Sequence, residues 1–389
     1  MKDDVIRITS LETHVAGTSF RNLTLVKLTT DAGIVGWGDA TLVIREHAVI
    51  AQLGYLGRIV VGMDALAPAD IWRRIVDEDF FMRSDLVGRS AVSGLMVACM
   101  DIAGKAYGVP VYRLLGGPVR ERIPCYANGW YKGERTPESY AELARGALAL
   151  GHTAIKLDPF GTAGILASER DIREAAEIVA AIREAVGPEV EIYVDAHSRF
   201  TPAMARRVAL SLEEHRIGFL EEPLAPDDYE GMRDFRASAP MPIAGGERAF
   251  SRFEFRHLIE NDCLDVIQPD ISWVGGLLEA QRIASWAEVH QMLISIHNAN
   301  SPLATATGCH LGASIPNLLS QEMWEDFDEP WVREAFPRAP RVEDGHLPLP
   351  TGPGLGVEPD EDALAEHPFR HVFLNLSQEN WDNFDAVLE

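Results

Sequence analysis

The chain has 389 residues, of which 47% are hydrophobic and 24% are charged, and its formal net charge is −24. This composition is typical of a globular protein that is too long for one ordinary core, so we expect two structural units. The acidic balance excludes nucleic acid and anionic membranes as natural partners, because both require a basic face.

Two further features of the sequence concern the compartment. The first residues, MKDDVIRITS, carry charges where a signal peptide needs an apolar core, and no apolar run is recognised that approaches the roughly 20 residues of a membrane helix. The four cysteines are far apart, lie in apolar sequence and lack metal-ligand spacing, so we expect reduced core residues. The protein is therefore predicted to be cytoplasmic.

Residues 1–122 have the pattern of a separate α+β domain. Strands are predicted in IRITSLETHVA and NLTLVKLTT, and TTDAGIVGWGD predicts a hairpin in which Gly33 supplies the turn. Helical spacing follows at Ile71 and Ile75, and then in a second helix at Leu95, Ala98, Cys99 and Ile102. A long amphipathic helix ends in GKAYGVPVYRLLGG, where glycines and a proline stop it.

Residues 123–345 show a repeated unit of a different kind. Helical stretches separate eight short apolar runs, which are CYANG, TAIKLDP, EIYVDAH, GFLEEPL, PIAGGE, DVIQPD, LISIHN and NLLSQE. Eight βα units in a row predict an α/β protein with a parallel (β/α)8 barrel of the TIM type, capped by the N-terminal domain. Residues 346–389 leave the repeat, and we expect them to return to the capping domain.

Nearly every predicted strand ends in an ionisable residue, and three of the acids are evenly spaced. Asp195, Glu221 and Glu247 are 26 residues apart (221 − 195 and 247 − 221), so successive units bring one carboxylate each to the same rim. Converging carboxylates repel one another unless a cation holds them, and oxygen ligands suit Mg²⁺. The alternative, ordinary strand-end charges in salt bridges or helix caps, explains one acid more readily than three.

The remaining strand ends carry groups for proton transfer. Asp270 and His297 end adjacent strands, and a carboxylate beside an imidazole makes a general base. His197 is expected across the rim from His297, where it could donate a proton to a leaving hydroxyl once metal binding has made an enediolate accessible. Glu322 on the last strand either shares a proton with the enediolate oxygen or forms a plain barrel salt bridge.

These motifs resemble the enolase superfamily and, within it, the mandelate racemase-like branch. The resemblance covers essentially the whole chain, in GIVGWGDA, DIAGKAYGVPVYRLLGG, AIKLDP, VDAH, FLEEP, GGERAF, DVIQPDISWVGG, ISIHN, LSQE and PGLGVE. GERAFSRFEF, VIQPDISWVGG and the Asp-x-His of the third strand are most similar to galactonate and gluconate dehydratases. The resemblance implies the roles of six residues: one Mg²⁺ per subunit on Asp195, Glu221 and Glu247, a base formed by His297 with Asp270, and His197 as the acid that releases the 3-hydroxyl to give a 2-keto-3-deoxy acid.

The sequence departs from the branch at the second strand. Racemases of this branch carry Lys-x-Lys, whereas this chain has Lys156-Leu157-Asp158, so the opposing lysine base is missing and two-base racemisation is disfavoured, with His197 as the candidate substitute. Lys156 is expected to contact the substrate carboxylate or the metal shell, the alternative being an ion pair with Asp158 or a nearby ligand. HNANSP after the seventh strand also differs from the most similar dehydratases.

The resemblance further implies that first-domain loops set specificity. Arg21 and Asn22 in HVAGTSFRN, Asp158, and Trp324 in MWEDFDEPW are the candidate substrate contacts, and an ordinary surface loop is the alternative for each loop. We expect a small sugar-acid substrate and a homo-oligomer. A cycloisomerase or epimerase of a related sugar acid or lactone, and a non-catalytic structural or binding descendant, are the competing hypotheses to an acid-sugar dehydratase.

Overall fold

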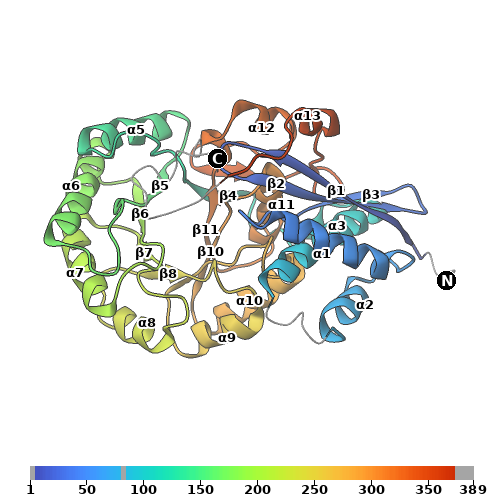
Figure 1. The fold of residues 1–389 in the computed structure, drawn as a ribbon, viewed down its shortest axis with the longest axis horizontal. Helices are drawn as coiled ribbons and strands as arrows, with labels where there is room; N and C mark the ends of the chain where they lie inside the picture. Colours follow the sequence, from blue (N-terminus) through green and yellow to red (C-terminus); the bar gives the residue numbers. More distant parts are fainter. Residues whose placement is uncertain (1–4, 80–84, 373–389) are drawn as a thin grey trace.

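A three-stranded antiparallel sheet with helices on it forms the first unit of the computed structural model, which describes residues 5–79 and 85–372 (Figure 1). The sheet has the order β1 (Ile8–Gly17), β2 (Asn22–Thr30), β3 (Val35–Asp39). The predicted hairpin joins β2 to β3, and Gly33 takes the left-handed conformation with φ 74°. The helices are α1 (Glu46–Val60), α2 (Pro68–Trp72), the π-helix η1 (Arg73–Asp77), α3 (Leu86–Tyr107) and α4 (Val111–Leu114).

Helix α3 is the core helix of this unit. A Cβ atom on Gly38 of β3 would lie 1.9 Å from the Gly94 carbonyl oxygen of α3, so the strand and the helix pack backbone against backbone. By length and composition α3 also qualifies as a membrane span, and the expectation that no segment does so is wrong here. Since 89% of its apolar window is buried inside the protein, α3 has the burial of a core helix.

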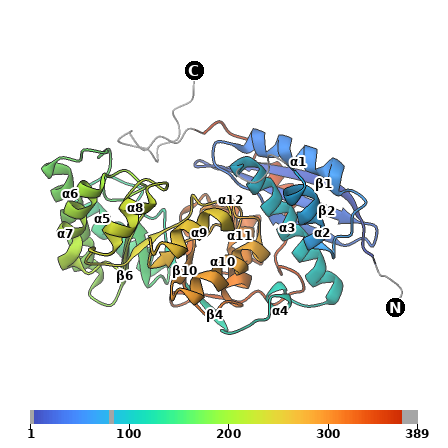
Figure 2. The same ribbon diagram turned by 90° about the horizontal axis from the view of Figure 1, so that it is seen from below.

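Eight parallel strands close into the predicted barrel. In pairing order they are β4 (Arg122–Ala127), β5 (Ala154–Leu157), β6 (Glu191–Asp195), β7 (Phe219–Glu221), β8 (Ile243–Gly245), β9 (Val266–Ile267), β10 (Leu293–Ile296) and β11 (Leu318–Met323), and β11 pairs back with β4. The connecting helices are α5 (Pro137–Ala149), α6 (Glu169–Val186), α7 (Pro202–Leu212) with the 3₁₀ turn η3 (Glu213–His215), α8 (Tyr229–Arg236), α9 (Arg252–Glu260), α10 (Leu277–Val289) and α11 (Pro302–Gly312). Figure 2 shows the first unit against one side of this barrel. The predicted fold class is confirmed.

The eighth unit differs from the other seven. After β11 the chain forms only the 3₁₀ turn η4 (Glu325–Phe327) and the short α12 (Pro330–Glu334), and β12 (His346–Pro348) then pairs antiparallel with β4. Beyond it the chain runs along the capping domain through α13 (Glu361–Ala365), where Gly17 N donates to His367 O at 2.9 Å. Residues 373–389 of the predicted returning segment lie outside the described residues.

The barrel interior is packed with side chains below its carboxyl rim. One buried layer contains Tyr126, Tyr193, Phe219, Ala244 and Val266. The Tyr193 and Phe219 rings stack with centroids 3.9 Å apart. All four cysteines are buried and unbonded to one another, as expected. The ionisable residues at the carboxyl ends of the strands therefore lie above an apolar layer, which keeps water out from that side.

Candidate active site

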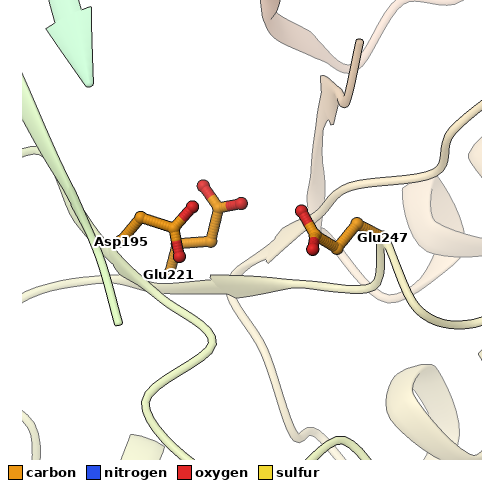
Figure 3. A group of neighbouring side chains, drawn as sticks. All are labelled: Asp195, Glu221 and Glu247. Carbon is orange, nitrogen blue, oxygen red and sulfur yellow. The ribbon is translucent and has the colours of Figure 1, made fainter. Parts of the chain in front are cut away.

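Three carboxylates meet at the carboxyl rim of the barrel. Asp195 and Glu221 are the last residues of β6 and β7, and Glu247 follows β8 by two residues. One oxygen of each lies within 4.8 Å of the others. In Figure 3 Asp195 and Glu221 lie side by side, and Glu247 faces them across a gap. Their oxygen-only chemistry and convergence fit Mg²⁺, which takes carboxylate ligands and completes its shell with water or substrate.

Lys156 of β5 lies within this acidic cluster. Its Nζ is 2.8 Å from Glu221 Oε2, 3.1 Å from Glu322 Oε1 and 3.3 Å from Asp195 Oδ2. Burial lowers the pKa of Lys156, but Glu221 and Glu322 outweigh it and hold the pKa above its ordinary value. Burial and the neighbouring Asp195 charge raise the pKa of Glu221. Among the described residues Lys156 thus pairs with Asp195, Glu221 and Glu322 and not with Asp158, and its contact with substrate stays a prediction.

His297 and Asp270 form the predicted pair. His297 follows β10, and its Nδ1 lies 2.8 Å from Asp270 Oδ2, so Nδ1 donates and Nε2 faces the carboxylates. That Nε2 is 3.1 Å from Glu247 Oε2 and 3.7 Å from Glu322 Oε2. Burial lowers the pKa of His297, but the charges of Glu247, Glu322 and Asp270 raise it to about 10. The His297 imidazole therefore lies at the Glu247 side of the cluster, where the surrounding carboxylates favour its protonated form.

His197 takes the corresponding place at the other side. Its Nδ1 lies 2.8 Å from Asp158 Oδ2, and its Nε2 lies 3.5 Å from Asp195 Oδ2. Burial lowers the pKa of His197, but Asp195 and Asp158 raise it to about 9. Because His197 adjoins Asp195 while His297 adjoins Glu247, which face each other in Figure 3, the two imidazoles flank the gap between the carboxylates.

The backbone at this rim is held in uncommon conformations. His197, Ser198 and Glu222 have φ angles of 45°, 54° and 39°, in the left-handed region that side chains other than glycine rarely adopt. Asp195 Oδ1 accepts from His197 N at 2.9 Å, and Glu222 O accepts from Ser198 N at 2.7 Å. Such strain persists only where the surroundings fix it, and it is concentrated at functional sites.

Buried amides complete the site, and the sequence reasoning missed them. Asn128 Nδ2 and Asn298 N donate to the two oxygens of Glu322, at 2.5 and 3.0 Å. Gln268 Nε2 donates to Glu221 Oε2 at 2.8 Å. The side-chain amides of Asn128 and Gln268 lie in the predicted runs CYANG and DVIQPD, so extending the strand-end argument from ionisable to amide residues would have found them. Asn298 in LISIHN donates through its main-chain N–H, for which its residue type gives no signal. They fix Glu221 and Glu322, which otherwise repel each other.

The comparisons with known proteins agree with this geometry. The family model described as enolase C-terminal domain-like matches residues 139–363, and the mandelate racemase/muconate lactonizing enzyme N-terminal domain model matches residues 3–116. The chain belongs to the mandelate racemase/muconate lactonizing enzyme family of the enolase superfamily. The prediction of an enzyme of the enolase superfamily, drawn from the motifs, is therefore confirmed.

Three relatives show how closely the chain matches other family members. It is 34% identical over 343 residues to D-gluconate dehydratase of Thermoproteus tenax, covering 88% of this chain and 69% of the relative. It is 35% identical over 350 residues to D-galactonate dehydratase of Pectobacterium atrosepticum, covering 88% and 90%. The crystal structure of a mandelate racemase/muconate lactonizing enzyme from Sulfitobacter sp. superposes with TM-score 0.89 at 34% identity, covering 94% and 96%.

Two of the predicted substrate contacts, Arg21 and Trp324, lie together where this family member's capping domain meets the barrel. The Arg21 guanidinium is buried, pairs with Asp328 at 2.8 Å, and lies 5.9 Å from the Trp324 ring. The Phe20 ring stacks on Trp324 with centroids 4.7 Å apart. Buried Arg21 Nε and Nη1 make no hydrogen bond within the described residues. Substrate contact at Arg21 and Trp324 stays a prediction.

Asn22 has different surroundings. Its Nδ2 donates to Glu46 Oε1 at 3.2 Å and to Arg370 O at 2.9 Å, and its Oδ1 accepts from Arg370 N at 2.8 Å. One amide hydrogen of Asn22 is thereby used within the capping domain, by Glu46, and the other by the C-terminal segment, at Arg370. The Asn22 side chain fastens β2 to the returning C-terminal segment, so any substrate contact there requires these bonds to break.

Proposed function

We propose that this family member is a Mg²⁺-dependent dehydratase of an aldonate such as galactonate or gluconate, yielding a 2-keto-3-deoxy acid. The observation that carries the proposal is a pair of imidazoles, each bound to a buried carboxylate through Nδ1, that adjoin opposite members of one carboxylate cluster. The dehydratase names of the relatives support the reaction class. The substrate is expected to be a small anion, and Lys156 is a buried cation within the carboxylate cluster of the rim.

The proposed reaction needs one base and one acid on different sides of the substrate. His297 Nε2 takes the proton from C2, and the electron pair of that C–H bond becomes part of a C2–C3 double bond. The C3–O bond breaks, and His197 Nε2 gives its proton to the departing oxygen, which leaves as water. The enol that remains tautomerises to the 2-keto-3-deoxy acid, with no oxidant or reductant required.

Asp195, Glu221 and Glu247 are the residues that would hold Mg²⁺. When bound, the ion neutralises the charge that develops on the substrate carboxylate as the C2 proton leaves. The residues of the chain supply the rest: Lys156 and Gln268 fix Glu221, and the apolar layer excludes water from below.

The surroundings of the two supporting carboxylates support the division of roles. Among the described residues, the donors to Asp270 other than His297 are neutral, namely Asn300 Nδ2 at 2.9 Å and Ser272 N at 2.7 Å, so no neighbouring cation offsets the charge by which Asp270 favours a protonated His297. Asp158 also receives the cationic Arg199, which offsets part of its charge. His297 therefore accepts a proton more strongly, and His197 releases one more readily, as a base and an acid require.

The proposal is tested by screening hexonates, pentonates and aldarates for 2-keto products with semicarbazide. We expect keto acid from an aldonate, its loss in EDTA and its return with Mg²⁺. His297→Asn is expected to abolish both keto acid and solvent deuterium exchange at C2, whereas His197→Asn keeps exchange and loses keto acid. Cys263→Ser, a buried thiol remote from the rim, is the matched control that keeps both.

The outcomes separate the competing functions. Deuterium in recovered substrate without any keto acid contradicts dehydration and identifies an epimerase or cycloisomerase. Keto acid formed at the wild-type rate by His297→Asn contradicts the assignment of the base. Inactivity towards every acid in the library contradicts the proposed substrate class and favours a non-catalytic role.

A further inference from the structure

His197 is held by a carboxylate from the neighbouring strand. Asp158 follows β5 directly, is 3% exposed, and accepts through Oδ2 from His197 Nδ1 at 2.8 Å. An ionised carboxylate has no hydrogen to give, so Nδ1 must carry one and Nε2 is the atom turned to the carboxylate cluster. His197 and Asp158 thus repeat the arrangement of His297 and Asp270 on the facing side of the rim.

We propose that Asp158 and Arg199 are positioning residues that fix the His197 imidazole on the leaving-group side of the site. The inference rests on the proposed function for the role of His197, and it reassigns Asp158 from a substrate contact to a residue that acts through His197. No covalent step involves Asp158 or Arg199. They set the direction in which His197 Nε2 delivers its proton to the departing hydroxyl.

Within the described part of the chain, the hydrogen-bond partners of the Asp158 carboxylate are all donors. Phe160 N donates to Oδ1 at 2.9 Å, and Arg199 Nη2 donates to the same Oδ2 as His197. Arg199 is itself fixed, because its Nε donates to Ala196 O at 3.0 Å and its Nη1 to Gly161 O at 2.7 Å. The carboxylate has three partners from two loops, so it cannot rotate without breaking several hydrogen bonds.

The backbone of His197 restricts the ring from its other end. Its φ of 45° is stabilised by the hydrogen bond from His197 N to Asp195 Oδ1. With the backbone fixed by Asp195 and Nδ1 fixed by Asp158, the ring has one orientation, in which Nε2 adjoins the cluster at 3.5 Å. A proton donor needs this restriction, because a misplacement of about 1 Å can reduce a rate about 10²-fold.

The charge at position 158 agrees with this role. A lysine there, as in Lys-x-Lys, would repel a protonated imidazole 2.8 Å away, whereas Asp158 stabilises it. Where the racemase pattern has a second lysine base, this chain therefore has Asp158, which holds the proposed acid His197. The Lys156-Leu157-Asp158 sequence then has a physical reason: Lys156 pairs with Glu221 of the carboxylate cluster, and Asp158 pairs with His197.

Asp158→Asn is the sharpest test, since an amide presents a donor where Phe160 N, His197 Nδ1 and Arg199 Nη2 are also donors. Whichever way the amide turns, its NH₂ faces either Phe160 N–H or the two donors at Oδ2, so His197 must tilt or change tautomer. We expect keto-acid formation to fall about 10²-fold, with KM and deuterium exchange at C2 changed by no more than a few-fold. Asp101→Asn is the matched control: it is equally buried and accepts from Trp37 N and Leu355 N, but it lies in the capping domain.

A second variant and an NMR measurement test the positioning role of Asp158 independently of Asp158→Asn activity. Arg199→Met leaves Asp158 intact and is expected to lower keto-acid formation about 10-fold with exchange retained, so it replaces Asp158→Asn if that variant does not fold. Ring ¹⁵N shifts of His197, assigned with His197→Asn, report the orientation without turnover and are expected to show Nδ1–H in the wild type and a changed ring state in Asp158→Asn.

Keto-acid rates and ring shifts unchanged in Asp158→Asn overturn the inference and leave the proposed dehydratase intact. A wild type that is inactive with every aldonate overturns the proposed function. In that case the ring shifts still decide whether Asp158 holds His197. Parallel loss of exchange and elimination in Asp158→Asn, but not in Asp101→Asn, also contradicts a role confined to the acid.

Discussion

Removing the buried ammonium of Lys156 tests whether the rim is organised around positive charge. Lys156→Met keeps the length of the stem but leaves Asp195, Glu221 and Glu322 without the cation that now lies 2.8–3.3 Å from them. Breaking a buried ion pair by removing one partner costs about 3–5 kcal/mol. For a domain of this size each 1 kcal/mol lowers Tm by about 2–4 °C, so we expect a fall of roughly 10 °C in EDTA.

Thermal unfolding followed by circular dichroism, with EDTA and with Mg²⁺, measures this effect. Mg²⁺ is expected to raise the Tm of Lys156→Met more than that of the wild type, because the ion replaces the missing charge, and binding at 100 times Kd adds about 2.7 kcal/mol. Lys27→Met is the control, since its ion pair with the 42% exposed Glu361 contributes at most about 1 kcal/mol. A Tm within about 2 °C of wild type for Lys156→Met in EDTA would refute the electrostatic reasoning.

Two other predictions concern stability. Burial lowers the pKa of His310 from 6.5 to about 4, and its Nε2 lies against Leu355 O. The neutral His310 therefore contributes fully to the free energy of unfolding above pH 6.5, and about 3 kcal/mol of this contribution is lost as the pH falls towards 4. In urea unfolding, the free energy of unfolding of His310→Gln should fall less steeply between pH 6.5 and pH 4 than that of the wild type, and an equally steep fall would contradict the prediction. Gly38→Ala is expected to lower the free energy of unfolding by about 3 kcal/mol, because its Cβ would meet Gly94 O of α3. Gly54→Ala is the control: it has open space around it and should raise the free energy of unfolding by up to about 1 kcal/mol. Equal urea midpoints for the two variants would exclude the close contact at Gly38.

The barrel could be predicted because its signals are local and repeated. Each parallel strand is an apolar run, each connection is helical, and all strands end on one rim, so Asp195, Glu221 and Glu247 converge whatever the details of the loops. The absence of a long helix after β11 could not be read in the same way, since MWEDFDEPW has no periodic apolar stripe and the chain there is shaped by contacts with β4 and the capping domain. Helix α3 was misjudged because a core helix and a membrane helix share a composition and differ only in what covers them.

The partners of individual rim residues depended on tertiary distances. The sequence argument gave Lys156 two possible ion-pair partners, Asp158 or a nearby ligand carboxylate, and the structure places its Nζ 2.8 Å from Glu221 Oε2. Asn22 was expected in a specificity loop, and two of its hydrogen bonds join it to Arg370, 348 positions later in the chain. Ångström-scale placement of this kind has no local sequence signal.

A crystal structure determined with Mg²⁺ and without substrate tests the central claim most directly. The account predicts one octahedral ion whose protein ligands are oxygens of Asp195, Glu221 and Glu247 at about 2.0–2.1 Å, with water at its other positions. An ion bound elsewhere, or no ion on Asp195, Glu221 and Glu247 at saturating Mg²⁺, would contradict it.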